Sequence, residues 1–367
     1  MSSTPAIPVT RTAIVLLLAA LLVLGALPAG AQVSERIAPS DDPVTGAIQI
    51  SQSSFTDGNA RRVVLGRSDV FADNLAGAAA TGAEGPLLLV DPAPEGLAGD
   101  VLTEIQRVVG DRSATQCDQR EEDVLVLGGT AAIDESVIGT LEASGYCPIR
   151  LAGNGRVETS VEVASYLLSQ FLTPDVSRGT LFIATGGNAA DSASASAYAA
   201  SIGAPIVVTE RDSLNPAVAD LLQPGDTAWD QVYLLGGVNA LTTEVEDQVV
   251  NALDERTVTT RIAGSTRDDT AFVVATELWG GARDGAATVL GFGETFWQTA
   301  LPAAAAAARL AAPLLYVQTD SVPGPTDLYL RQFVSNFLLT YGSEARISEE
   351  TRFEAESSLG SGMPGGM

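Results

Sequence analysis

The sequence predicts an α/β protein built from three tandem modules, each with a parallel sheet. Two observations carry this prediction. Short, continuous apolar runs alternate with segments of helical periodicity along most of the 367 residues, as expected for parallel strands that helices cover on both faces. The same motifs also return in the same order at intervals of about 110 residues, which indicates a repeated structural unit.

The first 31 residues have the pattern of a secretory signal peptide. Arg11 provides a positive flank, and an apolar core follows from Thr12 to Leu27. Small residues then lead to Ala31, after which a signal peptidase is expected to cut. An uncleaved membrane anchor is the alternative, but the apolar run is shorter than the ~20 residues that span a bilayer. We therefore expect an exported protein that leaves the membrane after cleavage.

The first repeated motif combines two arginines with a glycine and a threonine. It reads RLAGNGRVET from Arg150, RIAGSTRDDT from Arg261 and, in a degenerate copy, RIAPSDDPVT from Arg36. In the degenerate copy Asp42 takes the place of the second arginine. Three equal sites built on this motif are therefore not expected.

Two further motifs join a strand to a helix through a turn. One contains an apolar strand, a Gly-containing turn and an Ala-rich helix: VVLGRSDVFAD from Val63, LFIATGGNAAD from Leu181 and VLGFGETFWQ from Val289. The other is a strand that ends in a double glycine: VLVLGG from Val124 and VYLLGG from Val232, with a degraded third copy. In the motif with the Ala-rich helix, the first two copies end in the acidic residues Asp73 and Asp191, whereas the third copy ends in Gln298.

The repeats divide the chain into segments. They are the signal peptide 1–31, a first module 32–149, a second module 150–260, a degraded third module 261–352 and a disordered tail 353–367. Within each module strands alternate with helices, which specifies a parallel sheet with helical crossovers. Each repeat of about 110 residues is long enough to hold its own core.

Composition excludes several classes of chemistry. The chain has 45 acidic against 20 basic residues, a formal net charge of −25, no histidine and no lysine. A serine–histidine triad, a histidine-ligated zinc site, a P-loop lysine and a Schiff-base lysine are thereby excluded. The acidic balance also argues against nucleic acid as a partner. We expect no cofactor and no metal, and an enzyme of this composition could use only carboxylates, hydroxyls and arginines.

The two cysteines, Cys117 and Cys147, are expected to form a disulfide. An isolated pair in an exported chain is usually bonded. Each cysteine precedes a predicted strand, Val124 to Leu127 or Ile149 to Leu151. Neighbouring strands would bring the two thiols together.

Glycine-rich turns mark the carboxyl ends of the predicted strands, where ligands of parallel sheets collect. The candidate ligand-binding positions at these turns are Gly186, Gly187, Asn188, Gly236 and Gly237. A glycine turn that leads into a helix presents backbone N–H groups to an anion. The alternative is that glycine only permits a tight turn.

Charged residues near the turns are the remaining ligand-binding candidates: Asp73, Asp191, Arg150, Arg156, Arg261 and Arg267. The aspartates could bind a sugar hydroxyl, or they could merely stabilise a helix start. The arginines could bind a phosphate or carboxylate through paired hydrogen bonds. Equally, they could pair with neighbouring acids and join one module to the next.

Together these motifs resemble the cell wall-binding repeat 2 family, over almost the whole chain from Arg36 to Glu350. Modules of that family occur, usually in threes, in exported surface proteins of Gram-positive bacteria. The resemblance implies three modules packed side by side as a pseudo-threefold trimer. It also implies non-covalent attachment to an anionic wall polymer or a peptidoglycan-linked glycan.

We therefore expect a secreted, non-catalytic protein of the wall or cell surface. Neighbouring surface proteins are further candidate partners. Two alternatives stay open at the level of the sequence. One is a wall-associated hydrolase that uses carboxylates alone, and the other is a structural component of a surface layer.

Overall fold

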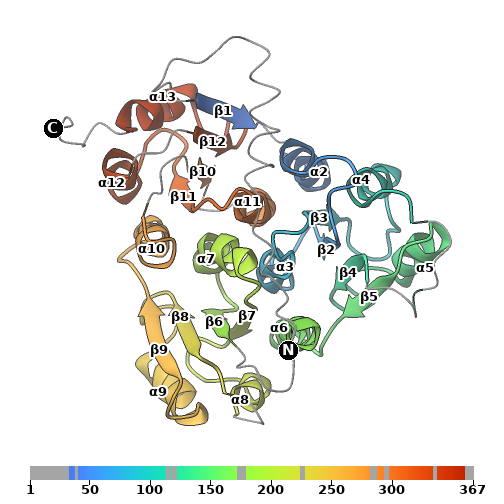
Figure 1. The fold of residues 1–367 in the computed structure, drawn as a ribbon, viewed down its shortest axis with the longest axis horizontal. Helices are drawn as coiled ribbons and strands as arrows, with labels where there is room; N and C mark the ends of the chain where they lie inside the picture. The colour runs from blue at the N-terminus through green and yellow to red at the C-terminus, as the bar shows by residue number, and fades with distance from the viewer. Residues whose placement is uncertain are drawn as a thin grey trace, which may run out of the picture.

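The computed structural model describes residues 33–37, 40–112, 117, 122–171, 179–223, 228–281, 287–292, 297–333 and 337–359. Helices and strands alternate within them, which confirms the predicted α/β class. The strands form three four-stranded sheets in which every pairing is parallel. Helices lie on both sides of each sheet (Figure 1). The predicted signal peptide lies outside the described residues.

The first two sheets follow one strand order. The first sheet runs β3 (Leu87–Val90), β2 (Val63–Arg67), β4 (Val124–Leu127) and β5 (Pro148–Leu151). The second runs β7 (Ile206–Thr209), β6 (Thr180–Thr185), β8 (Gln231–Leu235) and β9 (Val258–Ile262). The inner strands are mostly buried, as their continuous apolar sequences predict.

The third sheet takes its last strand from the start of the chain. Its order is β11 (Leu314–Val317), β10 (Ala287–Phe292), β12 (Phe337–Tyr341) and β1 (Val33–Ile37). Each sequence repeat thus begins with the strand that completes the preceding sheet, and the first repeat completes the third. The expectation that each repeat builds its own sheet is therefore wrong by one strand.

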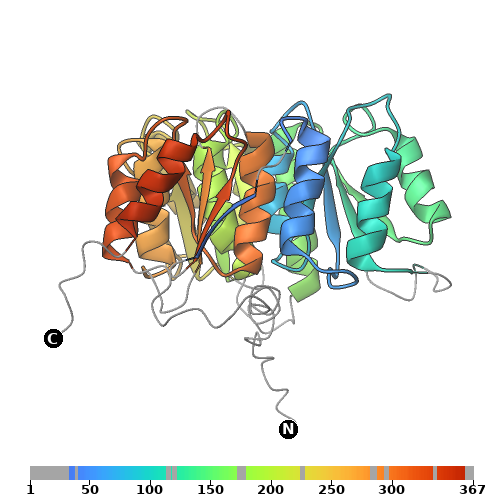
Figure 2. The ribbon, with the colours of Figure 1, turned by 90° about the horizontal axis from the view of Figure 1, so that it is seen from above.

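The helices follow the same division. The first module has α2 (Pro43–Ser54), α3 (Asn74–Ala80), α4 (Gly99–Val109) and α5 (Glu135–Ala143). The second has α6 (Arg156–Phe171), α7 (Ala190–Ser201), α8 (Pro216–Leu222) and α9 (Thr243–Ala252). The third has α10 (Arg267–Val273), the π-helix η3 (Val274–Leu278), α11 (Trp297–Arg309), α12 (Gly324–Gln332) and α13 (Glu349–Ser358). Most helices and strands run roughly parallel to one another in Figure 2, so the connecting loops gather at two ends of the molecule.

Three Ala-rich helices, α3, α7 and α11, occupy the centre of the molecule and contact one another (Figure 1). Nearly all of their residues are buried. Small side chains allow helix backbones to approach closely. Helix α3 also packs tightly on its own sheet, since a Cβ on Gly77 would lie only 2.5 Å from Leu127 Cδ1 of β4. One apolar cluster runs through all three modules. The modules thus pack side by side, while the pseudo-threefold symmetry stays a prediction.

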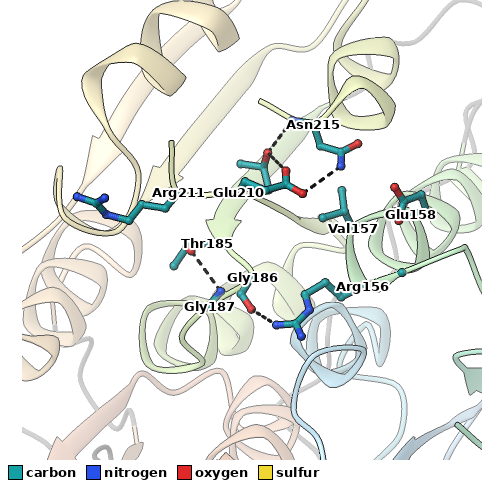
Figure 3. Close-up of a pocket in the computed structure, with 11 residues that line it drawn as sticks. Arg156, Val157, Glu158, Thr185, Gly186, Gly187, Glu210, Arg211 and Asn215 are labelled. Carbon is teal, nitrogen blue, oxygen red and sulfur yellow. Dashed lines mark hydrogen bonds between the residues drawn. The ribbon is translucent and has the colours of Figure 1, made fainter. Parts of the chain in front are cut away.

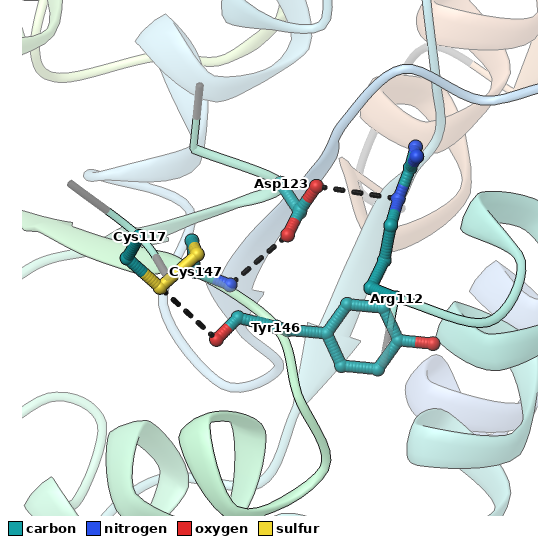
Figure 4. Close-up of a disulfide and its surroundings, with 5 residues drawn as sticks. All are labelled: Arg112, Cys117, Asp123, Tyr146 and Cys147. Atoms are coloured by element: carbon teal, nitrogen blue, oxygen red, sulfur yellow. Dashed lines mark hydrogen bonds and ion pairs between the residues drawn. A yellow bond between two sulfur atoms is a disulfide. The ribbon is translucent and has the colours of Figure 1, made fainter. Parts of the chain in front are cut away.

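The predicted disulfide between Cys117 and Cys147 is confirmed, with Cα atoms 5.4 Å apart. It ties the segment before β4 to the residue that precedes β5 (Figure 4). The Cys147 N–H also donates to Asp123 Oδ2 at 3.0 Å, and Arg112 forms an ion pair with the same carboxylate. These contacts hold the start of the strand that leads into the second repeat.

The disordered tail predicted for residues 353–367 is wrong at its start. Helix α13 continues to Ser358, where the Ser358 hydroxyl donates to Asp327 of α12. Arg352 forms ion pairs with Glu349 and Glu356, one turn away on either side. Residues 360–367 lie outside the described part. Among the described residues, no helix has both the length and the hydropathy needed to cross a membrane.

Close packing of the central helices can be tested by overpacking. Ala304 of α11 is fully buried, so Ala304→Leu should lower the free energy of unfolding by about 1–3 kcal/mol. Ala143→Leu at the exposed end of α5 is the matched control and should change little. Urea denaturation followed by circular dichroism measures both. Equal stability of the two variants would contradict a tightly packed centre.

Candidate functional site

Most of the predicted site residues gather at the carboxyl end of the second sheet. Strand β6 ends at Thr185, and the turn Gly186–Gly187 leads toward α7. The double glycine Gly236–Gly237 follows β8. Parallel strands place these turns on one edge, together with the loops after β7 and β9. Two clefts open along this edge.

The first cleft lies between the start of α6 and the ends of β6 and β7, and has a volume of about 480 Å³. Its lining residues are Gly155, Arg156, Val157, Glu158, Thr185, Gly186, Gly187, Thr209, Glu210, Arg211 and Asn215 (Figure 3). The Arg156 guanidinium donates to the Gly186 carbonyl at 2.7 Å. A Cβ on Gly186 would lie 3.0 Å from Arg156 Cδ, so glycine lets the arginine lie against the turn.

The second cleft is larger, about 890 Å³, and lies where the second module meets the third. Its lining residues are Thr185, Gly187, Asn188, Asp191, Arg211, Gly237, Val238, Asn239, Ala240, Gly264, Ser265, Thr266, Arg267, Asp268, Thr270 and Gln318. Gln318 directly follows β11 of the third module. Amide, hydroxyl and charged groups predominate here, and Asn188 Oδ1 accepts from the Ala190 N–H, at the first residue of α7, at 2.9 Å. The cleft suits a polar ligand with several hydrogen-bonding groups.

Arg211 lines both clefts, although the sequence motifs gave no sign of it. It lies in the loop after β7, and its Nε donates to the carbonyl of Asn239, in the loop after β8, at 2.8 Å. The side chain therefore crosses the end of β6, which lies between β7 and β8. Its terminal nitrogen binds Asp212 at 2.9 Å, and 53% of the side chain is exposed. Only its position after a parallel strand could have pointed to it.

Asp73 and Asp191 occupy equivalent places between one repeat and the next. Asp73 hydrogen-bonds with the Thr159 hydroxyl, which in turn accepts from the Gly153 N–H at 3.2 Å. Asp191 makes the same link through Thr270 to Gly264. Each link joins the aspartate of one repeat to the glycine and threonine of the following motif.

The same aspartates are pressed against the double-glycine turns. A Cβ on Gly128 would lie 2.6 Å from Asp73 Oδ2, and one on Gly236 would lie 2.5 Å from Asp191 Oδ2. Both glycines also have positive φ, +88° and +91°. Burial raises the pKa of both carboxyl groups above the ordinary value of 3.8, although nearby hydroxyls and arginines oppose the shift.

The first arginine of each motif completes a sheet rather than a cleft. Arg150 donates to the Gly128 carbonyl at 2.9 Å and pairs with Glu135. Arg261 and Arg36 make the matching contacts, with Gly236 and Glu246 and with Gly342 and Glu349. Neither Arg150 nor Arg261 lines either cleft. Their contacts favour the joining role over ligand binding.

The predicted site residues therefore separate into two groups. Those that line a cleft are Arg156, Gly186, Gly187, Asn188, Asp191, Gly237 and Arg267. Those that lie at the joints between repeats without lining either cleft are Asp73, Arg150, Gly236 and Arg261. At the third joint, Gln298 replaces the aspartate, and its buried Oε1 has no hydrogen-bond partner among the residues that the structure describes.

A family model for cell wall binding domain 2 matches residues 36–138, 150–246 and 261–352. The chain belongs to this family. The resemblance seen in the repeated motifs is thereby confirmed, and the three matches begin at Arg36, Arg150 and Arg261, the first residue of each arginine motif.

Among curated proteins, this chain is similar to two from Bacillus subtilis (strain 168). It is 23% identical to the N-acetylmuramoyl-L-alanine amidase LytC over 232 residues, which are 63% of this chain and 40% of that protein. It is 25% identical to the amidase enhancer over 229 residues, 62% of this chain and 29% of that protein. The chain thus spans less than half the length of either relative.

Two solved structures from Clostridium difficile share the fold. Cwp8 superposes with a TM-score of 0.74 and 25% identity, covering 95% of this chain and 55% of that one. Cwp6 superposes with a TM-score of 0.75 and 19% identity, covering 91% and 49%. These likenesses confirm an architecture of parallel-sheet modules.

The joining role of the first arginine predicts a loss of stability. Arg261→Gln removes an ionic hydrogen-bond network whose arginine side chain is only 16% exposed. We expect the free energy of unfolding to fall by about 1–2 kcal/mol. Arg331→Gln, which removes an exposed ion pair within one helix, should cost less than about 0.5 kcal/mol. Chemical denaturation measures both, and a stable Arg261→Gln variant would argue against the joint.

The raised pKa of Asp191 predicts a distinctive pH dependence. Ionisation of this buried carboxyl opposes folding, because burial disfavours its charged form. Its favourable contribution to the free energy of unfolding is therefore complete below pH 3.8, and it is lost as the pH rises through the pKa of the folded state. Relative to wild type, Asp191→Asn should therefore gain stability from acidic to neutral pH. Asp134→Asn should change in the opposite direction, because hydrogen bonds from Ser136 lower the pKa of Asp134. Denaturation across this pH range tests both signs, and parallel curves for wild type and Asp191→Asn would contradict the assignment.

Proposed function

We propose that this protein attaches non-covalently to an anionic polymer of the bacterial cell wall and catalyses no reaction there. Membership of the cell wall binding domain 2 family supports wall attachment. The observation that carries the site is the pair of adjoining clefts at the carboxyl edge of the second sheet, with Arg156, Arg211 and Arg267 in their walls. Arginine suits this task because its planar fork binds phosphate or carboxylate oxygens in pairs.

The overall charge makes local geometry decisive. A protein with net charge −25 repels a polyanion at long range. Attraction must therefore come from arginines held in concave sites, where water is partly excluded and Coulomb interactions are stronger. Glu158, Glu210 and Asp268 line the same clefts, so an incoming anion must approach the guanidinium groups closely. Salt that screens the long-range repulsion should assist this approach.

The cellular location follows from the same proposal. A segment with the pattern of a signal peptide precedes the first described strand. The family to which the chain belongs is described as a cell wall binding domain. We infer that the chain is secreted and retained at the surface of a Gram-positive-type bacterium.

Co-sedimentation with purified cell wall tests the proposal. Wild-type protein should pellet with intact wall and stay soluble when the anionic polymer has been stripped. Arg156→Gln should reduce retention about tenfold, as the loss of one charge-assisted contact predicts. Arg61→Gln, an exposed arginine away from both clefts, is the control.

Two results of the same experiment would contradict the proposal. Equal binding to intact and stripped wall would exclude the anionic polymer as the ligand. Release of reducing ends or stem peptides from the wall by the purified protein would instead reveal a hydrolase. Asp191→Asn would then be the first variant to assay, because its carboxylate lies in the larger cleft.

A further inference from the structure

We propose that a single polymer chain runs through both clefts of the second module, with Arg211 as the contact common to both, and that the matching edge of the first module repels the same chain. This inference rests on the proposed function. It adds the path of the ligand, the number of chains bound and a residue that no sequence motif marks.

The two clefts are continuous with each other. Thr185, Gly187 and Arg211 line both of them. The shared residues lie at the end of the central strand β6 and in the loop beyond β7. A polymer that occupies one cleft therefore meets the wall of the other without leaving the protein surface. Two separate chains would have to compete for the same three residues.

The Arg211 side chain is held by two contacts, one to a backbone carbonyl and one to a carboxylate. Its Nε is fixed on the Asn239 carbonyl, while a terminal nitrogen pairs with Asp212. The Asp212 side chain is 68% exposed, so this ion pair is worth little and can be exchanged for an anion of the ligand. In Figure 3 the Arg156 side chain reaches toward Gly186, whereas the Arg211 side chain points away from this turn. Two cationic groups thus flank one glycine turn.

The corresponding edge of the first module is more acidic than that of the second. There the arginine motif has Asp42 where the second module has Arg156, and the strand–helix motif has Asp69 where the second has Gly187. Strand β3 is followed by Asp91 and Pro92, whereas the corresponding β7 is followed by Glu210 and Arg211. Carboxylates thus stand in place of Arg156 and Gly187, and Pro92 stands in place of Arg211. Arg67, at the position of Thr185, is paired with Asp69. The edge of the first module is therefore more acidic than that of the second, and a polyanion is repelled there.

Binding measurements on the full-length protein test this path. The probe is the anionic polymer extracted from the wall that retains the protein, cut into fragments long enough to span both clefts. Calorimetry should give one fragment per protein. Arg267→Gln, which alters only the second cleft, should weaken binding about tenfold without changing this stoichiometry, since the two clefts act on one ligand.

Arg211 itself requires a matched comparison. Arg211→Gln should weaken fragment binding about tenfold, and Arg211→Lys should recover part of the loss because the charge returns without the fork. Arg256→Gln is the control, because Arg256 is an exposed arginine of the same module that also pairs with a nearby aspartate. Unchanged thermal melting of ligand-free Arg211→Gln would show that the effect is not loss of fold.

The opposite outcomes are equally specific. Two fragments per protein, falling to one of unchanged affinity in Arg267→Gln, would show independent clefts and overturn the single path. Normal binding by Arg211→Gln would remove this residue from the site while wall retention, and hence the proposed function, still stood. Wild-type protein that pellets with wall but ignores the extracted polymer would overturn the anionic ligand and this inference together.

Discussion

Completion of each sheet by the next repeat is the constraint on which the whole architecture depends. The first glycine after β4, β8 or β12 donates its N–H to the last residue of the added strand, at 2.9, 2.8 and 3.0 Å. Its carbonyl accepts from the arginine of that same strand. One residue thus satisfies both backbone groups across the joint, and the arginine charge is balanced by a glutamate from the following helix. Without the next repeat, each sheet would lose its edge strand.

This constraint also determines where the clefts form. Because the strand that completes a sheet continues directly into the next repeat, the start of that repeat is held beside the turns of the preceding sheet. Arg267 thereby reaches the second module's edge although it belongs to the third repeat by sequence. The clefts are therefore properties of neighbouring repeats in sequence. A single isolated repeat would lack one wall of the larger cleft.

Several features of this structure could be predicted from the sequence, for reasons that are local. Continuous apolar runs predict buried parallel strands, and two cysteines before neighbouring strands predict their bond. The offset between repeats and sheets could not be predicted, because the motif around Arg150 has the same sequence whichever sheet its strand joins. Arg211 was missed because the loop after β7 is not repeated. The end of α13, within the predicted tail, could not be predicted because its stability comes from ion pairs of Arg352 and contact with α12 rather than from an apolar face.

Divergence among the copies has a physical logic. The arginine contacts that join the repeats survive in all three, since Arg36, Arg150 and Arg261 each bind the glycine carbonyl of the preceding turn. Other positions differ, since Asp42 replaces an arginine that lines a cleft in the second module and Gln298 replaces the aspartate at the third joint. Losing a joint arginine would destabilise the module, whereas losing a cleft arginine changes what that edge attracts. With a net charge of −25, an edge stripped of its arginines becomes repulsive to a polyanion. On the proposed path, the arginines at the edge of the second sheet would determine where an anionic chain lies.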